Sequence, residues 1–199
     1  MKKFNILFVI LVSILGIYMG TNNFIKGHIS EALVSITILP VMILPLLLKK
    51  TLNLTDSTVM LYLVFVFFAQ FVGSMLNVYD TVPMFDKIMH LSSGVISSVL
   101  AVLLLVSFKK YDHENIGFNI LFIITTTFMV AGLWEIFEYS ADKVFSGDAQ
   151  RVIETGINDT MQDIIAAFFG AISFCILYAY EKINKVEFVI SKYIKELVR

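Results

Sequence analysis

The sequence predicts an all-α membrane protein, in which six transmembrane helices form one bundle. The chain has 199 residues, of which 58% are hydrophobic and 16% are charged, whereas soluble domains average about 45 to 50% apolar and 25% charged residues. Its mean hydropathy is +0.83. The apolar residues gather in six runs, each close to the roughly 17 to 25 residues that a helix needs to cross a bilayer. We expect residues 1–199 to form a single membrane domain.

The predicted spans cover residues 4–20, 31–48, 59–76, 86–108, 116–139 and 160–180. The first run follows Met1-Lys2-Lys3 and so also resembles a signal peptide. No small-residue cleavage pattern follows it, however, and the run is long enough to cross a membrane. Gly16 and Gly20 lie near its end with GxxxG spacing, which either allows close helix approach or is a coincidence.

The later spans carry features that predict their shape and neighbours. Pro40 and Pro45 remove backbone donors from the second span and should kink or break it. Gln70 is the interior polar residue of the third span, and we expect it to bond to another helix. The fourth and sixth spans should be close neighbours, because both carry small residues, namely Ser93, Gly94, Ser97, Ser98 and Ala101 in one and Ala166, Ala167, Gly170 and Ala171 in the other.

The end of the chain, residues 183–199, alternates apolar and charged residues. The apolar positions recur at helical spacing, which is typical of an amphipathic helix. We interpret this tail as a surface helix that lies on the membrane.

Basic residues predict the orientation of the spans. One side of the membrane holds Lys2, Lys3, Lys49, Lys50, Lys109, Lys110 and the basic tail, and the other side holds only Lys26, Lys87, Lys143 and Arg151. By the positive-inside rule, both termini are therefore cytoplasmic. One helix more or fewer would break this alternation.

Acidic residues within the spans indicate a candidate site. Glu135 and Glu138 lie in the fifth apolar run, where an ionisable group costs about 2.5 to 3.5 kcal/mol and normally faces a polar interior. The predicted topology brings two further pairs to the same non-cytoplasmic side: Asp86 with His90 at the start of the fourth span, and Asp159 with Asp163 at the start of the sixth. Residues three or four apart share a helix face, so each pair points one way.

Two kinds of chemistry suit these residues. Carboxylates with one histidine can hold a divalent cation such as Mg, Mn, Fe or Zn, and the six candidate metal ligands are Asp86, His90, Glu135, Glu138, Asp159 and Asp163. A cation would offset the repulsion among them. Without a metal, close carboxylates share protons, and Glu135 and Glu138 are then candidate catalytic groups that act as general acid and base or relay protons.

Each of these residues also has a structural interpretation. Asp86 and Asp159 could cap helix starts, since Asp159 and Gln162 have capping-box spacing. His90 could be an interior histidine with a satisfied hydrogen bond, and Glu138 could be solvated at the interface. Glu135 is the hardest to explain without a site. The aromatic residues Trp134, Tyr139 and Tyr79 fit an aromatic belt at the outer interface.

The connection from Ser140 to Asn158 is long for a helical bundle. It either folds over the outer mouth as a lid or forms an ordinary exposed loop. Arg151 is its one residue that could grip a phosphate or carboxylate bidentately. Asp80, which follows the third span on the same outer side, could rim the site.

Three motifs carry a resemblance to a known family. They are Asp86-Lys87-x-x-His90-x-x-x-Gly94, Trp134-Glu135-x-x-Glu138, and Asp159-Thr160-x-x-Asp163 followed by Gly170, and Tyr79-Asp80 fits the same pattern. Together they resemble the YjdF family of uncharacterised bacterial inner-membrane proteins over spans three to six. A more distant similarity is to VanZ-like membrane proteins, although Asp159 and Asp163 replace the later Asp-x-x-x-Asn element of that group. The first resemblance implies a multi-pass protein of the bacterial cytoplasmic membrane, and neither implies a reaction.

Three classes of function follow. The leading hypothesis is an outward-facing carboxylate and histidine site that binds a divalent metal and acts on a lipid head group or envelope metabolite, with membrane lipid as its partner. The alternatives are a small cation- or proton-coupled transporter or channel, and a structural membrane protein without catalysis. The formal net charge of −1 provides no field to recruit nucleic acid. The single cysteine, Cys175, excludes an intrachain disulfide.

Overall fold

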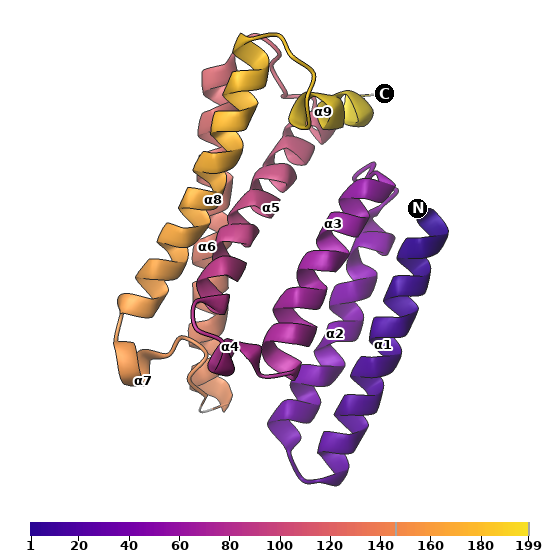
Figure 1. Ribbon diagram of the computed structural model, residues 1–199, viewed down its shortest axis with the longest axis vertical. Coiled ribbons are helices and arrows are strands. Elements are labelled where there is room, and N and C mark those ends of the chain that lie inside the picture. Colours follow the sequence, from indigo (N-terminus) through magenta and orange to yellow (C-terminus); the bar gives the residue numbers. More distant parts are fainter. Residues whose placement is uncertain (146, 199) are drawn as a thin grey trace. The chain divides into compact units, whose positions relative to one another are not determined.

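The computed structural model is all-helical and describes residues 1–145 and 147–198, among which there is no strand. Six of its helical segments are long and apolar enough to cross a membrane. The helices group into two compact units, residues 1–86 and 87–199, which Figure 1 colours from indigo to magenta and from magenta to yellow. That the six spans form one bundle stays a prediction.

The first unit contains α1 (Lys2–Ile25), α2 (Ile29–Leu48), α3 (Asp56–Val66), a π-helical continuation η1 (Phe67–Met75) and the short α4 (Val78–Thr81). Gly16 and Gly20 of α1 face α2: a Cβ on Gly16 would lie 2.5 Å from Ile38 Cγ2, and one on Gly20 would lie 3.0 Å from Ile36 Cγ1. The GxxxG spacing therefore marks a real close approach between two helices.

Polar contacts complete the packing of α2 against the third span. Pro45 cannot donate to the carbonyl of Val41 four residues earlier, and the hydroxyl of Tyr62 donates to that carbonyl at 3.2 Å. The amide of Gln70, in the π-helical segment, donates to Thr37 Oγ1 at 2.6 Å and to the carbonyl of Val34 at 3.1 Å. The expected bond from Gln70 to another helix is confirmed. Neither proline breaks the predicted second span, which runs unbroken as α2.

The second unit contains α5 (Phe85–Ser107), whose first two residues fall before the division, α6 (Ile116–Phe145), α7 (Val152–Thr155), α8 (Asn158–Ile183) and α9 (Ile190–Val198). Its core joins α5, α6, α8 and α9 around Ala101, Ile123, Phe174, Tyr178 and Ile194. The fifth predicted span ended at residue 139, but α6 continues to Phe145. The connection to α8 is therefore shorter than the sequence suggested.

The predicted tail helix is present as α9, but its first residue differs from the prediction. The helix begins at Ile190 rather than residue 183, and its last predicted residue, Arg199, lies outside the described residues. Its apolar residues Ile190 and Ile194 are buried in the core of the second unit. The carboxylate of Glu181 on α8 accepts the backbone N–H groups of Val189, Ile190 and Ser191. This cap supplies hydrogen-bond partners for the first N–H groups of α9. Part of the apolar face of α9 therefore packs against protein instead of lipid.

Candidate functional site

The candidate site lies where the first two turns of α5 meet the first two turns of α8. Lys87 and His90 are three residues apart on α5, and Asp159 and Asp163 are four apart on α8, so each pair shares a helix face. Lys87 Nζ donates to Asp159 Oδ1 at 2.6 Å and to Asp163 Oδ1 at 2.7 Å. His90 Nε2 lies 3.6 Å from Asp163 Oδ1. The two helices thus present one connected group of charged side chains.

Glycines allow the two helices to come this close. A Cβ on Gly94 of α5 would lie 1.9 Å from the carbonyl oxygen of Ala167, and a Cβ on Gly170 of α8 would lie 2.1 Å from the carbonyl oxygen of Leu91. Both are far below any tolerated contact with backbone, so only glycine fits. The expectation that the fourth and sixth spans are close neighbours is confirmed, and the glycines set the distance across which Lys87 reaches both aspartates.

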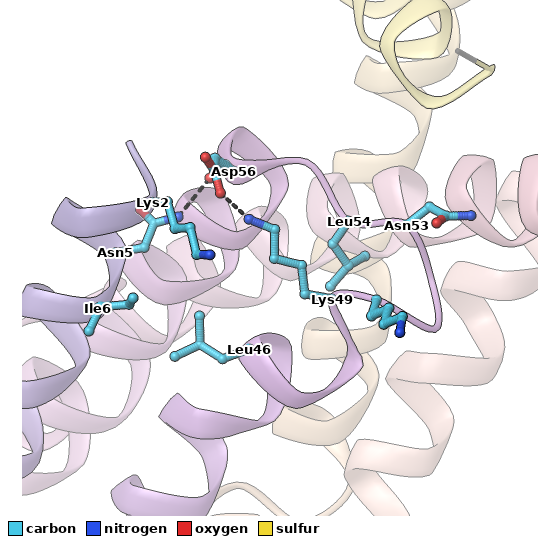
Figure 2. A pocket seen from close by; sticks show the side chains of 9 residues that line it. Lys2, Asn5, Ile6, Leu46, Lys49, Asn53, Leu54 and Asp56 are labelled. Atoms are coloured by element: carbon cyan, nitrogen blue, oxygen red, sulfur yellow. Dashed lines mark hydrogen bonds and ion pairs between the residues drawn. The ribbon is translucent and has the colours of Figure 1, made fainter.

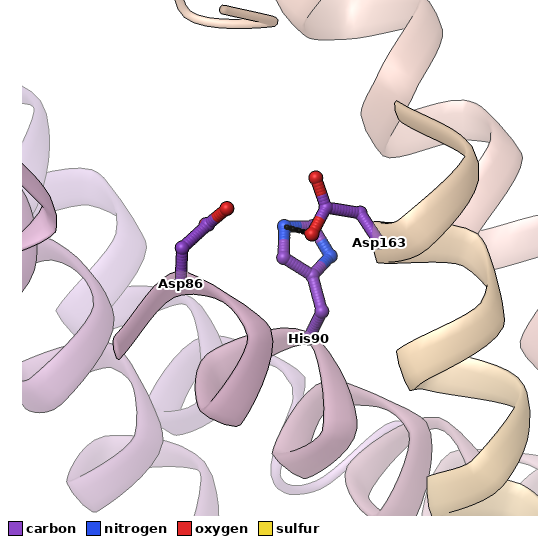
Figure 3. A group of neighbouring side chains, drawn as sticks. All are labelled: Asp86, His90 and Asp163. Atoms are coloured by element: carbon purple, nitrogen blue, oxygen red, sulfur yellow. Dashed lines mark ion pairs between the residues drawn. The ribbon is translucent and has the colours of Figure 1, made fainter. Parts of the chain in front are cut away.

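Three of the predicted ligands come together. Asp86, His90 and Asp163 each offer one ligand atom, and these atoms lie within 4.8 Å of one another. Figure 3 shows Asp86 and His90 on successive turns of α5, with Asp163 facing His90 from α8. Asp163 is only 3% exposed. Two carboxylates and an imidazole form a donor set that suits Mg, Mn, Fe or Zn.

Asp86, Asp159 and Asp163 supply three carboxylates to this region, and Lys87 supplies one ammonium group. Asp86, His90 and Asp163 therefore fit a divalent metal ion in the type of donor that they offer.

Glu135 and Glu138 do not belong to this three-residue group within the described part of the chain. Glu135 is 6% exposed on α6, and neither oxygen of its carboxyl group has a hydrogen-bond partner among the described residues. Glu138 Oε1 accepts the indole N–H of Trp134 at 2.8 Å. Glu135 is thus a buried, unsatisfied carboxyl group, which normally requires an explanation.

Hydrogen bonds hold the connection between α6 and α8 against both helices. The carboxylate of Asp142 accepts the backbone N–H groups of Ala149 at 2.6 Å and Gln150 at 3.0 Å. The side-chain amide of Gln150 donates, at 3.3 Å each, to the carbonyl of Glu135 and to Thr160 Oγ1. Gln150 therefore connects the backbone at Glu135 to the first turn of α8.

Arg151 and Asp80 were predicted to contact substrate or to belong to a lid. Arg151 directly precedes α7 with φ of 53°, and its carbonyl accepts the hydroxyl of Thr155 at 2.8 Å. Asp80 is exposed on α4 in the first unit. Their roles stay predictions.

Sequence reasoning missed two residues of this region. Lys87 was named as part of the Asp86-Lys87-x-x-His90 motif and as a charge that reports topology, but not as a partner of the aspartates on the sixth span. Gln150 had no signal, because its two partners lie on different helices. Asp159 was predicted to be either a helix cap or a metal ligand. Its Oδ1 accepts from Lys87, and its role as a ligand stays a prediction.

A comparison with protein-family models gives a match over most of the chain. A family model described as "Predicted membrane protein (DUF2238)" matches residues 4–183. Comparisons with curated proteins and with solved structures gave no match.

Proposed function

The chain belongs to the DUF2238 family of predicted membrane proteins. We propose that it binds a divalent cation at an outward-facing site and acts there on a lipid head group or a cell-envelope metabolite. We propose that this family is the same as the YjdF family, which the motifs of the chain resemble. The proposal includes a location in the bacterial cytoplasmic membrane, with both termini in the cytoplasm, because the basic residues favour that orientation.

The observation that carries the proposal is the 4.8 Å grouping of ligand atoms from Asp86, His90 and Asp163. In the proposal these three residues hold the cation. Lys87 acts as a positioning residue, since it binds the carboxylate of Asp163 and links it to Asp159, as partners of metal ligands commonly do. Three protein ligands would leave positions open for water or a phosphate oxygen of the substrate. A bound cation would polarise that group as a Lewis acid.

Glu135 and Glu138 stay candidate proton-transfer groups in this proposal. Gln150 supports this for Glu135, because it links the backbone there to the start of α8, which carries Asp159 and Asp163. A buried carboxyl group without a partner is also typical of a functional site.

Elemental analysis of detergent-purified protein tests the proposal. Purification without chelator, followed by addition and removal of excess metal, should leave one equivalent of a divalent metal in the unmutated protein and less than a tenth of it in Asp163→Asn and His90→Ala. Glu135→Gln is the control, because Glu135 lies outside the three-residue group, and it should keep the metal. Absence of metal from the unmutated protein after addition of Mg, Mn, Fe and Zn would overturn the proposal.

A second candidate, a proton-coupled transporter or channel, draws support from α6. Asn119, Thr127 and Glu135 are buried on this helix at intervals of eight residues. Thr127 Oγ1, like the Glu135 carboxyl group, has no hydrogen-bond partner among the described residues. Eight residues span about 12 Å of helix, so a relay along α6 would need water between these groups. That requirement makes the metal site the stronger candidate.

Proteoliposomes with a pH-sensitive dye distinguish the two. A relay predicts proton flux that Glu135→Gln and His90→Ala both abolish, whereas the metal proposal predicts no flux. A purely structural role predicts that these variants change folding yield alone.

A further inference from the structure

A cavity of about 600 Å³ lies at the predicted cytoplasmic end of the first unit. Its wall comes from the first turns of α1, the last turn of α2 and the connection from Lys49 to Asp56 (Figure 2). We infer that this cavity binds the phosphate-ester head group of an anionic phospholipid of the inner leaflet. The inference concerns the first unit, whereas the proposed metal site concerns α5 and α8, and the two proposals share only the predicted orientation of the spans.

The cavity carries an excess of positive charge. Three lysines line it, Lys2, Lys49 and Lys50, against the single carboxylate of Asp56. That carboxylate pairs with Lys49. No ion pair joins Lys2 or Lys50 to a carboxylate in the described part of the chain, and both residues are exposed. Two ammonium groups thus remain available for an anion, and basic pockets between transmembrane helices on the cytoplasmic side are suited to phospholipid head groups.

The shape of the cavity is held by bonds within the protein. The side-chain amide of Asn5, a residue only 2% exposed, donates to the carbonyl of Asp56 at 2.9 Å. Thr55 caps α3 by accepting the N–H of Thr58 at 3.1 Å. These hydrogen bonds hold the connection between α2 and α3 against α1 and α3 without a bound ligand. A site formed in advance loses less entropy on binding.

Apolar walls favour a lipid over a free phosphate ion. Ile6, Leu46 and Leu54 line the same cavity as the lysines. From Ile6 the exposed residues Ile10 and Ile14 continue along α1 at intervals of four, which places them on one helix face. A head group held by Lys2 and Lys50 could therefore extend an acyl chain along this stripe, whereas inorganic phosphate would use the lysines alone.

Native mass spectrometry of the detergent-solubilised full chain tests this inference. The probes are short-chain phosphatidylglycerol, short-chain phosphatidylcholine, glycerol phosphate and inorganic phosphate. The unmutated protein should bind phosphatidylglycerol about tenfold or more tightly than phosphatidylcholine. Lys2→Gln with Lys50→Gln should weaken phosphatidylglycerol binding about thirtyfold, at a typical contribution per lysine, and leave phosphatidylcholine unchanged.

Lys109→Gln with Lys110→Gln is the matched control. It removes the same charge from two exposed residues in the turn after α5, and it should change phosphatidylglycerol affinity less than threefold. An equal loss in this control, or no preference for phosphatidylglycerol, would overturn the inference.

The source of the phosphate group is tested separately. Ile6→Asn should weaken the binding of phosphatidylglycerol at least fivefold and leave inorganic phosphate unaffected. Equal affinity for glycerol phosphate and for phosphatidylglycerol would show a site for soluble phosphate esters and overturn the lipid assignment.

Discussion

At the scale of single residues, the contacts of Lys87 connect two helices of the second unit. Its ammonium group bridges Asp159 and Asp163, and the side chains of the three residues are 16%, 10% and 4% exposed. Water screens such a pair poorly, so removal of one partner leaves an uncompensated buried charge. The bridge also holds α5 and α8 in register at the candidate metal group.

Lys87→Met should therefore destabilise the protein by about 3 to 5 kcal/mol, the usual cost of breaking a buried ion pair. The free energy of unfolding in detergent measures this. Lys195→Met is the matched control, since it breaks an ion pair with Glu187 in which both side chains are more than half exposed, and it should cost less than about 1 kcal/mol. A similar small loss for Lys87→Met would mean that the bridge does not stabilise the fold.

At the scale of helices, the contact between α5 and α8 depends on two residues without side chains. Gly94 and Gly170 each meet the opposite backbone, so a single methyl group must push the helices apart. Because Lys87 and His90 lie one to two turns before Gly94, such a shift would also separate them from Asp159 and Asp163. The geometry of the site is thus a consequence of helix packing in lipid.

Gly94→Ala should destabilise the protein by about 1 to 3 kcal/mol, as overpacking does, and should lower the metal content predicted above. Gly132→Ala on α6 is the control, because nothing lies within 4 Å of its Cβ position. It should stabilise the helix by up to about 1 kcal/mol, since alanine is the better helix former. Equal effects of the two substitutions on thermal unfolding and on metal content would contradict this account of the interface.

At the scale of the whole molecule, the six spans and the basic residues between them predict which ends face outward. The candidate metal group and the connection between α6 and α8 should face the outside, and the cavity around Lys2 and Lys50 should face the cytoplasm. The site and the lipid cavity would then serve opposite leaflets.

Cysteine labelling in intact cells measures this orientation. The native Cys175 is 5% exposed, so it should react little and leave a low background. A membrane-impermeant maleimide should label Ala149→Cys and should not label Lys110→Cys until the cells are opened. Labelling in the reverse pattern would place the candidate metal group in the cytoplasm and would exclude an action on envelope metabolites.

The sequence by itself determined the class of protein and its six spans, and it named six candidate ligands, which include the three residues of the candidate group. It could do so because length, apolar composition and lysine placement act locally, and because small residues such as Gly94 and Gly170 have one main use in lipid. The pairing of Asp86 with His90 followed from helical periodicity alone.

Only the tertiary structure decided which of these residues meet. In the structure, Asp163 lies beside His90, and Asp159 pairs with Lys87. The carboxyl group of Glu135 is buried without a hydrogen-bond partner among the described residues. Ile190 and Ile194 lie in a protein core. Each of these outcomes depends on the rotation and separation of helices distant in sequence. Helical periodicity shows which residues share one face of a helix. Which face of another helix packs against it depends on residues of both helices, so the sequence of one helix does not determine it.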